Sequence, residues 1–378
     1  MDGRSRAFDS PRRLQAVDAL RGLIIILMAL DHANHFVAQE HSPGEYWGGV
    51  FLAYSETLPF LTRLVTHLAA PGFFFLMGVG MILYANSRTQ AGQNRRRIMS
   101  HFLVRGALLI ALQFLVVNRA WELSPGGWGL EMYVGVLFAL GSAMIVSSLL
   151  IWLKSGYLIV LAGALLVGTE LIHPDPATWN QVNLTVFERL FIHPTGDRSL
   201  WSNYPVLPWL ELAVLGLAYG HWLTRDSKRT FRWGAFLGVG LLVLFVLLRA
   251  VDGFGNIRPR AGSSWIDFLN VVKYPPSLTF TFLTMGVNMI ALGLLSRIAE
   301  KRTILLQPLV VYGRTPLFFY LVHLFLYAGL GRLFTPEGTT IPGMIPYWLL
   351  GLVILYPLCF WFSRVRSSRP AGSPIRYI

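Results

Sequence analysis

Three stretches of this chain are each long enough to cross a lipid bilayer and contain no charged residue. They are Met132–Leu153, Tyr274–Ser296 and Gly338–Ser363. A spanning helix needs about 20 mostly apolar residues, because the hydrocarbon core of a bilayer is about 30 Å thick. Only 13% of the residues are charged and 54% are apolar, whereas charged residues make up about 25% of an average soluble protein. These features argue against a water-soluble enzyme.

Further apolar segments extend this pattern and predict an all-α integral membrane protein, a bundle of about ten transmembrane helices. The predicted spans are 21–38, 64–85, 101–118, 131–153, 156–172, 206–223, 233–250, 276–296, 312–333 and 345–363. Lys and Arg concentrate in cytoplasmic loops, and placing both termini in the cytoplasm puts 22 of the 32 Lys and Arg residues on that side. We expect a basic cytoplasmic segment 1–20, a single membrane domain 21–363 and a basic cytoplasmic tail 364–378, in the inner membrane of the cell.

The net charge of +13 is interpreted as a signal of topology, so the lipid bilayer is the expected partner and nucleic acid is not. Three outer connections, 39–63, 173–205 and 251–275, exceed the length of about 12–15 residues above which loops are commonly functional. Arg258 and Arg260 lie in the third connection and, together with Glu131, are candidates for binding a substrate.

Ionisable side chains at membrane depth are costly and usually mark a site. Most of those in this chain fall in or near the outer half of the predicted bundle: Asp31, His32, His35, His67, Glu131 and His323. A neutral histidine is a natural general base near neutral pH when another group orients its second nitrogen. We therefore predict a site for proton transfer there, with His32 as the first candidate for the base and Asp31 and Glu131 as candidate orienting groups.

The spacing between Arg21 and His32 places both on one face of the first span. Eleven residues at 100° each make three turns plus about 20°, with an axial separation of about 16 Å. An elongated ligand with an anionic head at the cytoplasmic edge and a reactive tip in the membrane fits this pair, because a guanidinium suits phosphate.

Other interpretations of these residues predict different chemistry. His32 and His35 supply only two nitrogens for a metal, so no metal is expected, and haem ligation by histidines of two helices is a further alternative. The single cysteine, Cys359, excludes a disulfide within one chain. The G-x-x-x-G at Gly216–Gly220 predicts a helix-packing notch.

Five segments together carry a family resemblance. They are RLQAVDALRGLIIILMALDH (13–32), THLAAPGFFFLMGVGM (66–81), YPVLPWLELAVLGLAYG (204–220), SWIDFLNVVKYPPSL (264–278) and GRTPLFFYLVHLFL (313–326). They resemble the bacterial relatives of heparan-alpha-glucosaminide N-acetyltransferase, within the superfamily of transmembrane acyltransferases.

The resemblance implies a membrane enzyme that moves an acyl group, typically acetyl, from cytoplasmic acyl-CoA to a sugar amine or hydroxyl across the membrane. Related polysaccharide O-acyltransferases have an R-x10-H pattern, which Arg21 and His32 match. By that match, Arg21 helps to hold the CoA and His32 acts near the thioester. Further candidates for contacting acyl-CoA (acetyl-CoA) are Arg105, Arg314, His67 and His323.

The chain also departs from the pattern of the lysosomal enzyme. That enzyme has an asparagine where this chain has His32, an aspartate about where His67 falls, and a catalytic histidine in the following loop, where His41 is a loose counterpart. The general base can therefore be His32, His35 or His41. Direct transfer from acyl-CoA and transfer through an acyl-histidine intermediate are both possible. The alternative function is a multi-span transporter or flippase, although no repeated halves are found. A second copy of the chain is a further candidate partner.

Overall fold

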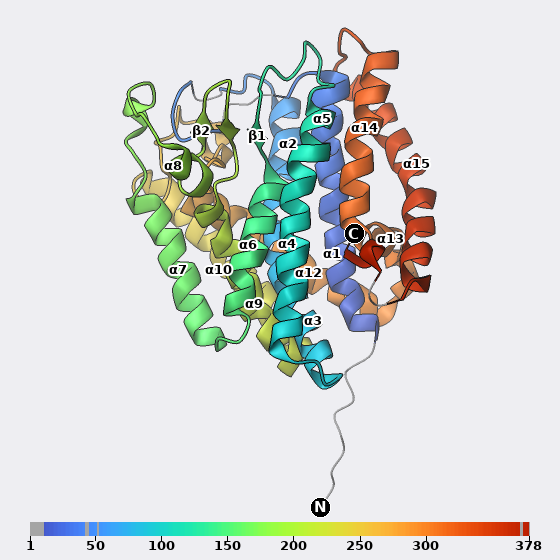
Figure 1. Cartoon of the computed structure of the whole chain (residues 1–378). Helices are drawn as coiled ribbons and strands as arrows, with labels where there is room; N and C mark the ends of the chain where they lie inside the picture. The colour runs from blue at the N-terminus through green and yellow to red at the C-terminus, as the bar shows by residue number, and fades with distance from the viewer. Residues whose placement is uncertain (1–10, 42–44, 51–52, 371–372, 378) are drawn as a thin grey trace, which may run out of the picture.

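The computed structural model describes residues 11–41, 45–50, 53–370 and 373–377. Long, roughly parallel helices form one bundle, and Figure 1 shows them upright with the longer connecting loops above and short turns below. The bundle helices are α1 Pro11–Ala33, α2 Thr57–Thr66, α3 Ala69–Gln90, α4 Arg95–Leu112, α5 Asn118–Trp121, α6 Val136–Leu150, α7 Ser155–Leu171, α9 Val206–Arg225, α10 Ser227–Val251, α12 Leu278–Lys301, α13 Gln307–Gly313, α14 Pro316–Phe334 and α15 Ile341–Ser368.

Shorter elements connect these helices. π-helical turns η1 Asn34–Ala38 and η2 Gln113–Val117 extend α1 and α4, and the remaining short helices are η3 Pro176–Thr178, α8 Val186–Phe191, α11 Trp265–Leu269, η4 Thr303–Leu306 and η5 Pro374–Tyr377. Strands β1 Tyr133–Val134, β2 Thr195–Gly196 and β3 Trp201–Ser202 form a small sheet in the order β1-β3-β2. The pairing of β1 with β3 is parallel and that of β2 with β3 is antiparallel. The fold is therefore mostly helical, and this sheet is the exception to the predicted all-α class.

Each of the ten predicted spans overlaps a helix. Within the described ranges, seven helical segments are long and apolar enough to cross a membrane: Thr57–Gln90, Arg95–Trp121, Val206–Arg225, Ser227–Val251, Leu278–Lys301, Pro316–Phe334 and Ile341–Ser368. Helices α6 and α7 are apolar but shorter, and α1 together with η1 covers the first predicted span. The prediction of a multi-span helical membrane protein is confirmed in this coarser form, and the count of ten spans stays a prediction.

The two ends of the bundle differ in character. Helix α1 begins and α15 ends at the lower end in Figure 1. We call this the basic end, because Arg21, Arg314 and Arg366 lie there. The upper end holds the described parts of three connections, 39–41 with 45–50 and 53–56, 172–205, and 252–277, and is called the loop end.

Glycines let the helices of the centre approach closely. A Cβ added to Gly216 of α9 would lie 2.0 Å from the carbonyl oxygen of Phe75 in α3, and one added to Gly78 would lie 2.1 Å from that of Ala213. Such distances are far below van der Waals contact, so only glycine permits this crossing. The packing notch predicted at Gly216–Gly220 is confirmed.

Candidate active site

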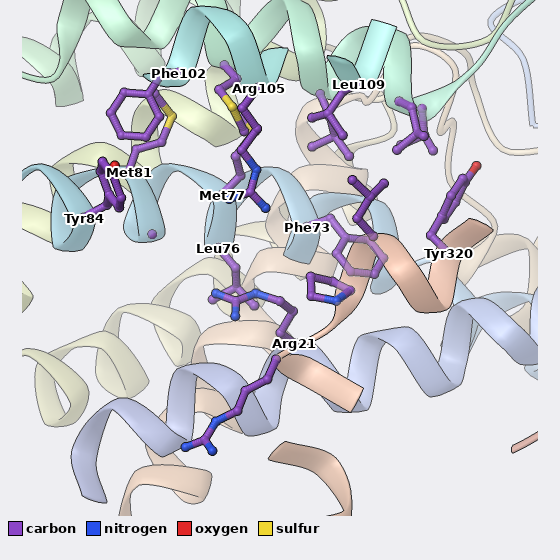
Figure 2. Close-up of a pocket in the computed structure, with 18 of the residues that line it drawn as sticks. Arg21, Phe73, Leu76, Met77, Met81, Tyr84, Phe102, Arg105, Leu109 and Tyr320 are labelled. Atoms are coloured by element: carbon purple, nitrogen blue, oxygen red, sulfur yellow. The ribbon is translucent and has the colours of Figure 1, made fainter. Parts of the chain in front are cut away.

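A cavity of about 520 Å³ lies between α1, α3, α4, α6 and α14. Figure 2 shows its side chains, with Tyr84 and Phe102 at one end and Tyr320 at the other. Most of the walls are apolar, made by Phe73, Leu76, Met77, Met81, Leu109, Val136, Leu137, Leu140, Met144 and Leu317. The cavity can therefore hold an elongated and largely uncharged group along most of its length.

The mouth of the cavity at the basic end is positively charged. Arg21, Arg105, Arg314 and Arg366 line it, together with the single carboxylate of Asp18. Arg21 donates to Asp18 Oδ1 at 2.9 Å and to the carbonyl of Gly313 at 3.0 Å, which fixes its guanidinium. This excess of positive charge favours an anionic ligand.

Arg105 differs from its neighbours because it has no hydrogen-bond or ion-pair partner among the described residues. Its Nε is buried and unsatisfied. A buried charged donor without a partner is costly, and the cavity is the space toward which this donor is available (Figure 2). An anion in the cavity would satisfy it.

The inner end of the cavity adjoins a pair of histidines. Tyr320 lines the cavity, and its ring centroid lies 6.3 Å from that of His32. His32 Nδ1 lies 2.6 Å from His323 Nε2, and His323 Nδ1 lies 2.9 Å from the carbonyl oxygen of Phe319. Residues 291 positions apart in the sequence thus form one hydrogen-bonded chain where α1 packs against α14.

A separate network of charged groups lies above this pair, toward the loop end. Arg63 of α2 donates from Nε and Nη2 to the two carboxylate oxygens of Glu45, each at 2.5 Å, and it also pairs with Asp31. His67 Nε2 lies 2.8 Å from Glu45, and His41 Nε2 lies 2.8 Å from Arg63 Nη1. Sequence reasoning missed Arg63 and Glu45, although an arginine four positions before His67 in an apolar segment was a usable signal.

Two loop residues have displaced pKa values: Glu45 of this network, and Lys273, whose backbone N–H donates to the Glu45 carbonyl. Burial alone would raise the pKa of Glu45, but the charges of Arg63 and His67 hold that pKa well below its usual value. Burial, together with the nearby positive charge of Arg63, lowers the pKa of Lys273 to about 8. Glu45 and Arg63 thus compensate each other's charge on burial, which is the behaviour of a structural ion pair.

The predicted catalytic residues divide between the two groups. Asp31 pairs with Arg63 and Thr66 rather than with His32, so it does not orient that imidazole. His35 Nε2 lies 2.9 Å from Ser124 Oγ, and its ring centroid is 5.7 Å from that of His41. The three candidate bases therefore follow one another from the centre of the bundle to the loop end.

Of the other predicted residues, some line the cavity and some do not. His67 belongs to the charged network and does not line the cavity, whereas Arg314 and Arg105 do. Glu131 is exposed beside β1, where its backbone N–H donates to the carbonyl of Arg198.

The two loop arginines hold loop structure at the loop end. Arg258 donates to the carbonyl groups of Tyr46 and Gly48, and Arg260 pairs with Asp252. Within the described ranges, no group of three metal-ligating side chains is close enough to hold a metal ion.

Comparison with known proteins places most of the chain in one family model. Residues 13–247 match the model described as heparan-alpha-glucosaminide N-acetyltransferase, catalytic. Heparan-alpha-glucosaminide N-acetyltransferase of Homo sapiens is 31% identical over 140 residues, which are 37% of this chain and 19% of the relative. The Mus musculus protein of the same name is 30% identical over 141 residues, with the same shares. The matched segment thus spans about a fifth of the length of these curated relatives, and α14 lies beyond the family match.

Proposed function

The chain belongs to the heparan-alpha-glucosaminide N-acetyltransferase catalytic family, and from that premise we propose that it is a membrane acyltransferase. It takes an acyl group, in the first instance acetyl, from acyl-CoA at the basic end. It delivers this group to a sugar amine or hydroxyl at the loop end. In this proposal the basic end faces the cytoplasm, and the enzyme is a multi-pass protein of the inner membrane.

The cavity is the observation that carries the proposal. Its charged mouth suits the phosphate groups of CoA, because guanidinium groups bind phosphate through paired hydrogen bonds. Its apolar walls suit the thin arm that joins the nucleotide to the thioester. Its inner end adjoins His32 through Tyr320, so a donor lying along the cavity brings its thioester to an imidazole.

The proposed chemistry at this point is acyl transfer with His32 as the acting base or nucleophile. As base, His32 takes the proton of the acceptor amine or hydroxyl while the acceptor attacks the thioester carbonyl. The carbon–sulfur bond then breaks, and the CoA thiolate leaves with the bonding electrons and takes up the proton. As nucleophile, His32 instead attacks the thioester carbonyl itself, and the carbon–sulfur bond breaks as the CoA thiolate leaves. The acceptor then attacks the acyl-histidine, its proton is released, and the bond between the acyl group and the imidazole breaks.

A reconstitution experiment tests this proposal. Protein in proteoliposomes is incubated with radiolabelled acetyl-CoA, and both CoA binding and release of the acetyl group to water or glucosamine are measured. His32→Gln is expected to bind CoA normally and to lose acyl transfer. Full activity of that variant would remove His32 from the mechanism, and absence of CoA binding by the unmodified protein would refute the proposal. Accumulation of a sugar without CoA would instead support the transporter alternative.

A steric variant tests the route of the donor. Gly80 lines the cavity, and a Cβ added there meets no atom within 4 Å, so Gly80→Leu is expected to fold and to obstruct the cavity. Gly163→Leu is the matched control, because Gly163 of α7 has equally open surroundings but does not line the cavity. Normal CoA binding by Gly80→Leu would contradict the proposed route.

A further inference from the structure

We propose that His323 is a positioning residue that fixes the proton of His32 on Nδ1 and thereby leaves the lone pair of His32 on Nε2. The hydrogen-bonded chain from the Phe319 carbonyl through His323 to His32 carries this inference. Its structural part concerns the tautomer alone, while its catalytic consequence rests on the function proposed above.

The direction of the chain is set at the Phe319 carbonyl. A carbonyl oxygen only accepts hydrogen bonds, so His323 Nδ1, at 2.9 Å from it, carries a hydrogen. His323 is 0% exposed, and among the described residues no carboxylate contacts it. A buried imidazolium without a counter-charge is costly, so the neutral ring is favoured and its Nε2 keeps a lone pair.

The second hydrogen bond follows from the first. Since His323 Nε2 is an acceptor, His32 Nδ1, at 2.6 Å from it, is the donor. The two ring planes are inclined by only 24° and the centroids are 4.9 Å apart. Rings stacked face to face at that separation would not bring two nitrogens to 2.6 Å, so the rings lie side by side and the hydrogen bond runs close to both planes.

This arrangement leaves His32 Nε2 available for chemistry. Within the described part of the chain, no group is hydrogen-bonded to that nitrogen. Trp121 and Tyr320 contact the His32 ring edge-on, at 89° and 76°, and restrict its rotation. Nε2 is thus a nitrogen with a free lone pair and a fixed direction, and the ring of Tyr320 that contacts His32 also lines the cavity.

The role of His323 resembles that of the orienting residue in a catalytic triad, which holds a histidine in one tautomer and stabilises its charged form. A carboxylate usually does this, and Asp31 is the nearest in sequence, but Asp31 is paired with Arg63. A backbone carbonyl acting through a second histidine replaces it here. Loss of the correct tautomer is a loss of general base catalysis, typically worth about 10²–10⁴ in rate.

Nitrogen NMR of protein labelled with ¹⁵N-histidine tests the tautomer without reference to activity. His32→Gln identifies the signals of His32 by their disappearance. In the unmodified protein, His32 is expected to carry hydrogen on Nδ1 and none on Nε2. In His323→Leu, the variant without an acceptor, a population with hydrogen on Nε2 is expected. Hydrogen on Nε2 of His32 in the unmodified protein would overturn the inference.

Kinetics test the consequence. His323→Leu is expected to lower kcat by 10²-fold or more, with little change in the KM for acetyl-CoA. In His323→Gln the amide oxygen can accept the hydrogen bond from His32, so at least 10-fold of that loss in kcat should be recovered. His221→Leu is the control, because His221 is likewise hydrogen-bonded to a backbone carbonyl, that of Ile151, but does not line the cavity. Equal kcat values for the Leu and Gln variants would contradict the positioning role. The expected tautomer in a protein without acyl transfer would instead refute the proposed function and leave the positioning intact.

Discussion

Replacing Arg105 by methionine is expected to stabilise the protein and, at the same time, to weaken its binding of CoA. Arg105 is half-buried on α4, its Nε lacks a partner, and it is repelled by the charges of Arg21 and Arg366. The folded protein without ligand therefore gains nothing from this charge. Methionine keeps an unbranched side chain of similar length and removes both the charge and the unsatisfied donor.

The magnitudes follow from the same geometry. A buried donor without a partner costs about 1–3 kcal/mol, so Arg105→Met should increase the free energy of unfolding by on the order of 1 kcal/mol after the loss of some packing is allowed for. A hydrogen bond to a charged group contributes about 1.5–3 kcal/mol. At about 1.4 kcal/mol for each factor of ten, loss of that bond to a CoA phosphate should raise the Kd about 10- to 150-fold.

Two measurements on detergent-purified protein check this pair of opposite effects. The thermal unfolding midpoint without ligand should rise, and the Kd for CoA from calorimetry should rise with it. Arg96→Met serves as the control, because Arg96 is an exposed arginine at the same end that does not line the cavity, and neither quantity should change. A lower midpoint with an unchanged Kd would show that Arg105 is a structural residue and would refute the reasoning.

Two further substitutions test stability. Burial lowers the pKa of Lys273 to about 8, whereas an unfolded lysine holds its proton to a pH of about 10.4. The free energy of unfolding should therefore rise by roughly 3 kcal/mol between these pH values, and Lys273→Met should abolish that rise in a pH series of unfolding midpoints while Lys154→Met, at an exposed site, should not. In Gly22→Ala the new Cβ would lie 1.9 Å from the carbonyl oxygen of Leu309, and such overpacking typically costs about 1–3 kcal/mol. Gly163→Ala, in open space, should be neutral or stabilising, and equal midpoints for the two alanine variants would contradict this account.

The helical segments could be predicted from the sequence because lipid-facing helices need long apolar runs, but their interruptions could not be predicted as easily. The predicted span 312–333 is split between α13 and α14 at Arg314 and Thr315. Pro316 causes the split, since proline lacks an N–H and disfavours helical geometry in the residue before it. The break leaves the Gly313 carbonyl free to accept from Arg21. The position of Pro316 in the sequence was enough to predict this break between α13 and α14.

The fourth predicted span shows a limit of a different kind. Helix α6 begins at Val136 rather than near residue 131, because Tyr133 and Val134 pair with Trp201 and Ser202 as strands. Pairing partners almost 70 positions away leave no trace in the hydropathy of the segment itself. The contact between His32 and His323 is of the same kind, since each histidine was recognisable as ionisable at membrane depth but only the packing of α1 on α14 brings them together.

Arg63 and Arg105 show why the function of a buried charge follows from its partners rather than from its position in the sequence. Both are arginines within or beside apolar helical segments, and the residues next to them in the sequence do not show which of the two has partners. Arg63 has its donors satisfied by Glu45 and Asp31, so its charge is compensated within the fold. Arg105 has an unsatisfied Nε beside other cations at the mouth of a cavity. The charge of Arg63 is compensated within the fold and that of Arg105 is not, so we expect an anionic ligand to bind beside Arg105.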